Sequence, residues 1–120
     1  MGDDKSFYFS FICYFSNLVR GKVTRLKAKR VPHMGWNTVE SEDGIMDGIS
    51  SRHFYFAHSY YARPADPGIV VAATDYGDTF PAVVESRNIF GLQFHPEKSS
   101  RLGLNILRNF AEIVNESHRI

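Results

Sequence analysis

Residues 91–99 read GLQFHPEKS, and they mark the point at which the chain is predicted to change from strand to helix. The apolar residues before His95 are typical of a buried strand. Pro96 locks its own backbone angle and favours an extended conformation for the residue before it. Side chains two apart on an extended chain point the same way. Glu97 is therefore expected to reach one imidazole nitrogen of His95 while the other nitrogen faces a substrate.

The segment after this stretch repeats its apolar residues at the three- and four-residue steps of an amphipathic helix. Ser99 or Ser100 can cap this helix, which is predicted to run to about Glu116. The apolar face is expected to comprise Leu102, Ile106, Leu107, Phe110, Ile113 and Val114.

Upstream, short β-branched and aromatic runs alternate with turn residues, which is typical of strands joined by tight connections. Such spacing favours antiparallel neighbours. Residues 41–51 are polar and contain glycine, so we expect an exposed connection there. Strands are predicted at residues 23–26, 36–40, 53–61, 69–74, 80–85 and 89–94. One helix against these strands indicates an α/β domain, in which ligands bind beyond the strand ends.

A histidine held by a carboxylate is the orienting part of a nucleophilic triad. His95 and Glu97 are thus candidate catalytic residues. As a three-residue pattern, however, His-x-Glu also fits a strand end with a surface ion pair.

Composition narrows the possible functions. Lys and Arg number 14 against 13 acidic residues, so the charge gives no general attraction to nucleic acid or anionic membranes. The basic residues within 22–30 alternate with apolar ones, as on a solvated strand edge. The apolar run at residues 7–15 is about half the length of a membrane span. The histidines show no metal-ligand spacing, and neither a metal nor a cofactor is predicted.

Four motifs together resemble one known family. Residues 94–97 (FHPE) are similar to the His-Pro-Glu signature of class I glutamine amidotransferases. Residues 31–37 (VPHMGWN), residues 54–60 (FYFAHSY) and Lys98-Ser99 resemble the branch that forms the glutaminase subunit of imidazole glycerol phosphate synthase. The motifs occur in order with compatible gaps. The resemblance implies the flavodoxin-like α/β fold of that family, of which this chain would be the C-terminal part.

The resemblance also implies an activity, the hydrolysis of glutamine to glutamate and ammonia by a Cys-His-Glu triad. His95 would be the general base and Glu97 its orienting acid. The segment His58, Ser59 and Tyr60 would line the glutamine pocket. A surface of Trp36, Asn37, Tyr55 and Lys98 would face the cyclase partner, a β/α barrel that receives the ammonia for histidine biosynthesis. From the residues alone, Trp36 and Tyr55 could equally be core.

The family nucleophile is expected to be missing. It lies on a Gly-x-Cys-x-Gly turn, whereas the lone cysteine, Cys13, has Phe11 and Phe15 where the turn needs glycines. Residues 1–20 are predicted to be a non-family segment, and residues 21–120 the C-terminal part of the amidotransferase domain. We therefore expect the chain to be inactive alone. Its single cysteine fits a reducing cytoplasm. One face of its sheet is expected to be exposed, which would cause marginal stability or self-association unless residues 6–15 supply a strand. Two alternatives are a non-catalytic fragment that keeps the cyclase-binding surface and a glutaminase of another pathway.

Overall fold

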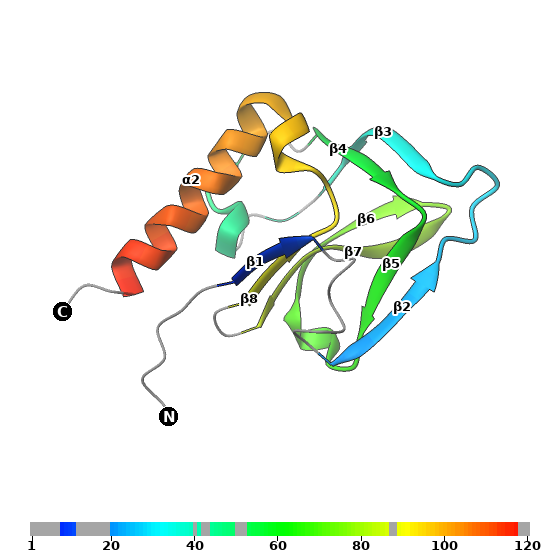
Figure 1. Cartoon of the computed structure of the whole chain (residues 1–120), viewed down its shortest axis with the longest axis horizontal. Coiled ribbons are helices and arrows are strands. Elements are labelled where there is room, and N and C mark those ends of the chain that lie inside the picture. Colours follow the sequence, from blue (N-terminus) through cyan, green and yellow to red (C-terminus); the bar gives the residue numbers. More distant parts are fainter. Residues whose placement is uncertain are drawn as a thin grey trace.

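The computed structural model describes residues 8–11, 20–39, 41, 44–49, 53–86 and 89–117 (Figure 1). Its strands are β1 (Tyr8–Phe11), β2 (Gly21–Arg25), β3 (His33–Thr38), β4 (His53–His58), β5 (Tyr60–Pro64), β6 (Val70–Tyr76), β7 (Asp78–Ser86) and β8 (Ile89–Leu92). Its helices are the 3-10 turns η2 (Gly44–Met46), η3 (Pro67–Ile69) and η4 (Pro96–Lys98), and the α-helix α2 (Ser100–Ser117). No helix in these ranges is long and apolar enough to cross a bilayer.

The strands form one larger sheet and two pairs. The larger sheet has the order β1-β8-β7-β6, and β1 runs parallel to β8 while the other neighbours are antiparallel. β2 pairs with β5, and β3 pairs with β4, both antiparallel. The short connections predicted antiparallel neighbours, and this is confirmed for the β6–β7 and β7–β8 pairs of the larger sheet. In the β1–β8 pair, Phe11 lies beside Leu92. Residues 6–15 therefore do supply a strand to the sheet, which was the possibility that the sequence analysis had left open.

The core combines aromatic side chains on β4, β7 and the segment after β8 with aliphatic side chains from several elements. Phe54 stacks on Phe94 with ring centroids 4.2 Å apart, and Phe56 and Phe80 are fully buried beside them. Helix α2 runs alongside this core (Figure 1) and inserts Ile106 into it. The β4 strand is thereby fixed on its inner face, while its other face lies toward the surface.

The start of α2 packs unusually closely against η4. A Cβ atom built on Gly103 would lie 1.7 Å from the carbonyl oxygen of Pro96. Only glycine permits this approach. The close contact sets the helix directly behind the turn that carries Glu97.

Several predicted boundaries were wrong. The segment 41–51 was expected to be exposed, but Ile45, Met46 and Ile49 within it are buried core residues. Its amide groups find partners on distant elements, since Ile45 N–H donates to Glu85 and Asn109 donates to the carbonyl groups of Ile45 and Asp47.

The predicted strand at residues 36–40 in fact begins at His33 and includes Gly35, which adopts a φ of 121°. The predicted strand at 53–61 is two strands that separate at Ser59. In α2, Leu107 is exposed rather than part of the apolar face, whereas Ile106 is buried and Leu102, Phe110 and Ile113 pack on the core as expected. The basic residues on and after β2 are exposed as predicted.

Candidate active site

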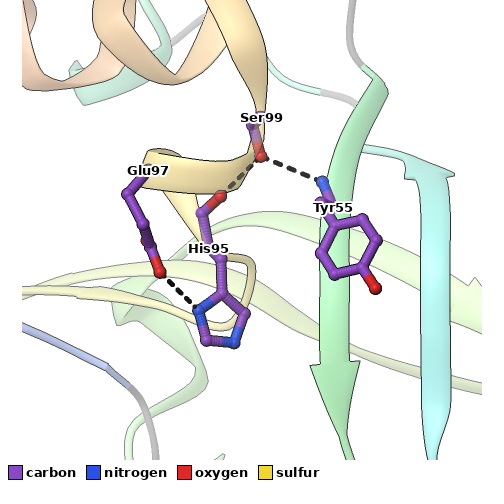
Figure 2. Close-up of polar contacts among 4 residues, drawn as sticks. All are labelled: Tyr55, His95, Glu97 and Ser99. Atoms are coloured by element: carbon purple, nitrogen blue, oxygen red, sulfur yellow. Dashed lines mark hydrogen bonds and ion pairs between the residues drawn. The ribbon is translucent and has the colours of Figure 1, made fainter.

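His95 stands just beyond β8 in the extended conformation that Pro96 was expected to favour, with φ −96° and ψ 102°. Its Nδ1 lies 2.9 Å from Oε2 of Glu97 (Figure 2). The predicted contact is confirmed, but the predicted reason was wrong. Residues Pro96–Lys98 form a 3-10 turn, so the turn and not an extended chain brings the carboxylate back to the ring.

This contact orients the imidazole. A carboxylate can only accept, so Nδ1 of His95 carries the proton and, in the neutral ring, Nε2 carries the lone pair. Partial burial raises the pKa of Glu97, but the hydrogen bond from His95 and the positive charges of His95 and Lys98 outweigh it, so the pKa lies below its ordinary value. Glu97 is therefore ionised at neutral pH. The pair has the arrangement of a general base with its orienting acid.

The main chain of His95 is held by β4. His95 N–H donates to the carbonyl oxygen of Tyr55 at 2.8 Å. The Ser99 hydroxyl donates to the carbonyl oxygen of His95 at 2.7 Å and accepts from Tyr55 N–H at 2.9 Å (Figure 2). Ser99 or Ser100 was predicted to cap the helix, and the side chain of Ser99 bonds outside it.

Two histidines that the sequence left without a joint role lie in direct contact. Nδ1 of His33 is 2.9 Å from Nε2 of His58, although the residues are 25 apart in the chain. His58 Nδ1 lies 2.9 Å from the carbonyl oxygen of Tyr60, and His33 Nε2 lies 3.3 Å from Nδ2 of Asn37. The ring of His33 also stacks on Tyr76 with centroids 4.0 Å apart.

The partners determine where the protons sit. A carbonyl only accepts, so His58 carries its proton on Nδ1 and presents a lone pair on Nε2 to His33. His33 must then donate from Nδ1 and accept from Asn37 at Nε2. The Asn37 amide is oriented to do so, because its Oδ1 accepts from Thr38 N–H and its Nδ2 also donates to the Asp75 carbonyl. An added proton on either ring would place two donors face to face.

Both rings are accordingly difficult to protonate. Burial lowers the pKa of His33 to about 4, and the charge of His58 adds to the effect. Burial also lowers the pKa of His58, and the charge of His95 adds to that, while the hydrogen bond to the Tyr60 carbonyl opposes it. His58 thus lies close enough to His95 for the two charges to interact. Ser59, the next residue, accepts Leu26 N–H at its carbonyl, and Tyr60 is exposed.

Two of the four predicted interface residues, Trp36 and Tyr55, lie together on the outer face of β3 and β4, and a third, Lys98, approaches them from η4. Trp36 is 52% exposed, and its ring meets Tyr55 edge-on with centroids 6.0 Å apart. Lys98 places its Nζ 6.0 Å from the centroid of the Tyr55 ring. We call Trp36, Tyr55 and Lys98 the aromatic surface. Asn37 points to the other side of β3, into the histidine network, so the structure does not bring it to this surface.

The interpretation of Cys13 concerns a residue outside the described ranges. Among the described residues, sequence reasoning missed the roles of His33 and Ser99. A histidine three residues before Trp36 carries no signal of its partner on another strand, and Ser99 had an adequate local explanation as a cap.

Comparisons with known proteins bear on the family of the chain and on its fold. The model of the family described as glutamine amidotransferase class-I matches residues 12–114. The subunit HisH of imidazole glycerol phosphate synthase from Halobacterium salinarum is 52% identical over 101 residues, covering 80% of this chain and 46% of that protein. Its counterparts from Archaeoglobus fulgidus and Pyrococcus furiosus are 50% and 48% identical, each over 80% of this chain and about half of the relative.

The chain thus spans about half the length of the curated relatives it matches. Among solved structures, a GMP synthase protein from Thermoplasma acidophilum superposes with a TM-score of 0.75 over 96% of this chain and 60% of that one. At 20% identity this likeness concerns the fold alone. It confirms the predicted fold class.

Proposed function

Because this chain belongs to the class I glutamine amidotransferase family, we propose that it acts as the C-terminal part of a glutaminase subunit of imidazole glycerol phosphate synthase. In this role His95 takes the proton of a cysteine thiol, which becomes the nucleophile, and later gives it to the departing ammonia of glutamine. Glu97 orients His95 and stabilises its cation. The observation that carries the proposal is the 2.9 Å contact between His95 Nδ1 and Glu97 Oε2 at the end of a strand.

The remaining assignments follow from the same proposal. The corner at His58, Ser59 and Tyr60 would receive the amino-acid head group of glutamine. The aromatic surface, with Asn37 behind it, would bind the β/α-barrel cyclase. The two chains would form a heterodimer in the cytoplasm. The ammonia released from glutamine would then enter the lyase reaction of histidine biosynthesis. No cofactor is required. The relatives named HisH, about half identical to this chain, favour this pathway over guanylate synthesis.

The source of the nucleophile is the point to test first. Cys13 is the only cysteine in the sequence, and we propose that it is not the family nucleophile because phenylalanines replace the flanking glycines. The test is informative because β1 and β8 are neighbouring strands, and Cys13 and His95 each follow one of them closely in the sequence. Phe11 pairs with Leu92, and in the sequence Cys13 and His95 follow these residues by two and three positions.

The experiment measures ammonia release from glutamine by the purified chain and by its Cys13→Ala variant. No release is expected from either. The chain is then mixed with the residues of the Archaeoglobus fulgidus relative that precede its matching segment, where the Gly-x-Cys-x-Gly turn of the family is expected. We expect this mixture to release ammonia, and Glu97→Gln to reduce the rate by roughly 10⁴-fold, as loss of the orienting acid does in other triads. Release that is abolished by Cys13→Ala would overturn the assignment of Cys13, and a complemented rate insensitive to Glu97→Gln would overturn the roles of the pair.

A second candidate function is binding without catalysis, which the exposure of the aromatic surface favours. Trp36 is 52% exposed and Met34 beside it is 62% exposed. We expect the chain to bind the purified cyclase, and Trp36→Ala to weaken Kd about 30-fold, the effect of losing a hot-spot residue worth about 2 kcal/mol. Leu104→Ala is the matched control, because Leu104 is 61% exposed on α2 instead. Equal effects of the two variants would argue against this docking surface.

A further inference from the structure

A buried hydroxyl joins the candidate base to the neighbouring strand. Ser99 has 0% exposure, and its Oγ sits between the His95 carbonyl at 2.7 Å and the Tyr55 amide at 2.9 Å. The direct bond from His95 N–H to the Tyr55 carbonyl, at 2.8 Å, completes a ring of three hydrogen bonds, of which Figure 2 draws the two that Ser99 makes. Both main-chain groups of Tyr55 are therefore used to hold the segment that carries His95.

We propose that Ser99 is a positioning residue that fixes the backbone of His95 to strand β4, an inference that rests on the proposed role of His95 as base. Glu97 controls only the rotation of the imidazole, because it touches the ring at Nδ1. The position of the ring in space depends on the main chain of His95. A base must lie within hydrogen-bond reach of the proton it takes, so a shift of this main chain alone would displace it.

The role needs a hydroxyl in particular. The oxygen donates one hydrogen bond and accepts another at the same time, which neither a methyl group nor a single donor can do. An ordinary helix cap would accept from an amide within the first turn of its own helix. In α2 it is the backbone carbonyl of Ser99 that accepts from Gly103 N–H, at 3.2 Å, and the side chain serves the contact with β4.

The same ring reaches the aromatic surface. The side chain of Tyr55 lies against Trp36 and below Lys98, while its main chain holds His95. A partner bound to this surface would therefore contact Tyr55, the strand residue whose main chain is hydrogen-bonded to His95. Ser99 supplies two of the three bonds in that connection.

The test uses the full chain and the carboxyl titration of Glu97, followed by ¹³C NMR in wild type, Ser99→Ala and Ser99→Thr. In wild type the His95 hydrogen bond helps to keep the Glu97 pKa low. We expect Ser99→Ala to loosen this bond, so that the pKa of Glu97 rises towards its ordinary value and the His95 Nδ1–H proton signal is lost. Ser99→Thr retains the hydroxyl and should restore both, and Ser100→Ala, at the exposed neighbouring serine, should change neither. A folded Ser99→Ala variant with wild-type Glu97 titration and Nδ1–H signal would overturn the proposal, since a merely structural role would lower Tm only.

A wild-type measurement keeps the proposal testable if Ser99→Ala does not fold. The amides of Tyr55 and His95 should exchange with solvent at matching rates, because one opening event breaks the whole ring. Tyr55 exchange roughly tenfold or more faster than His95 exchange would show that Ser99 does not join them, since a typical hydrogen bond is worth about that factor. Neither readout needs ammonia release or a partner, so failure of the proposed function in the assays above would be recognised separately.

Discussion

Acidification should destabilise this protein through His33. The ring is 2% exposed, stacked on Tyr76, and its two nitrogens are committed to His58 and Asn37. In the unfolded chain a histidine titrates near pH 6.5, whereas burial lowers the pKa of His33 in the folded chain to about 4. The folded state therefore resists a proton that the unfolded state accepts.

The sign and size follow from this difference. Well above pH 6.5 neither state binds the proton, so His33 imposes no cost. As the pH falls from 6.5 to 4, only the unfolded state is protonated, and the free energy of unfolding decreases. At pH 5 the decrease is about 2 kcal/mol, and below pH 4 it levels off at about 3 kcal/mol, from the pKa of about 4 and about 1.4 kcal/mol per pH unit. Such a loss is a large part of the stability of a domain of this size.

The assay is urea unfolding between pH 7.5 and pH 4, followed by the fluorescence of Trp36, for wild type and His33→Gln. The variant should be less stable at pH 7.5, because it loses the stacked ring, but its stability should fall less steeply between pH 6.5 and pH 4. His53→Gln is the matched control, since His53 is an exposed histidine on β4. Parallel pH profiles for wild type and His33→Gln would refute the reasoning, because they would place the titrating groups elsewhere.

The remaining predictions concern packing and backbone strain, and all are measured as changes in the free energy of unfolding. Gly103→Ala should destabilise by about 2 kcal/mol, because overlap of the new Cβ with the Pro96 carbonyl outweighs the gain of about 1 kcal/mol in helix propensity; a stabilised variant would contradict the close approach. Phe94→Ala should cost about 3–5 kcal/mol through loss of the fully buried ring that stacks on Phe54, and a loss below about 1 kcal/mol would exclude this core. Ser100→Gly should stabilise by about 1 kcal/mol, because Ser100 has a φ of 54°, and a destabilised variant would argue against that conformation.

The features that the sequence predicted well are local ones. Apolar residues at helical spacing predicted α2, because a helix that packs against a core needs apolar side chains along one face. Pro96 acts on its immediate neighbour, so the extended backbone of His95 could be inferred from two residues. The contact of His95 with Glu97 was also predicted, because the two residues are only two positions apart. The 3-10 turn that produces the contact was not predicted.

The features that the sequence did not predict depend on pairing between distant segments. His33 meets His58 only because β3 and β4 pair in a register that sets these two residues opposite each other. A shift of one residue would turn His33 to the outer face. Ile45 and Ile49 are buried because their short polar segment passes under α2, with Asn109 of that helix bonding to it. Local polarity predicted exposure, and tertiary contacts overrode it.

The two histidine systems become more than neighbours under the proposed function. His95 must carry a positive charge while it holds the proton of the nucleophile, and a second charge nearby would make that state costly. His58 is close enough for its charge to oppose that of His95. The Tyr60 carbonyl, His33 and Asn37 hold His58 in one neutral tautomer, since each bond in the series has a fixed direction. The network therefore removes the competing charge while leaving an imidazole at the corner assigned to glutamine. Under the proposed function, the His33–His58 pair of β3 and β4 thus serves the chemistry of the site as well as its stability.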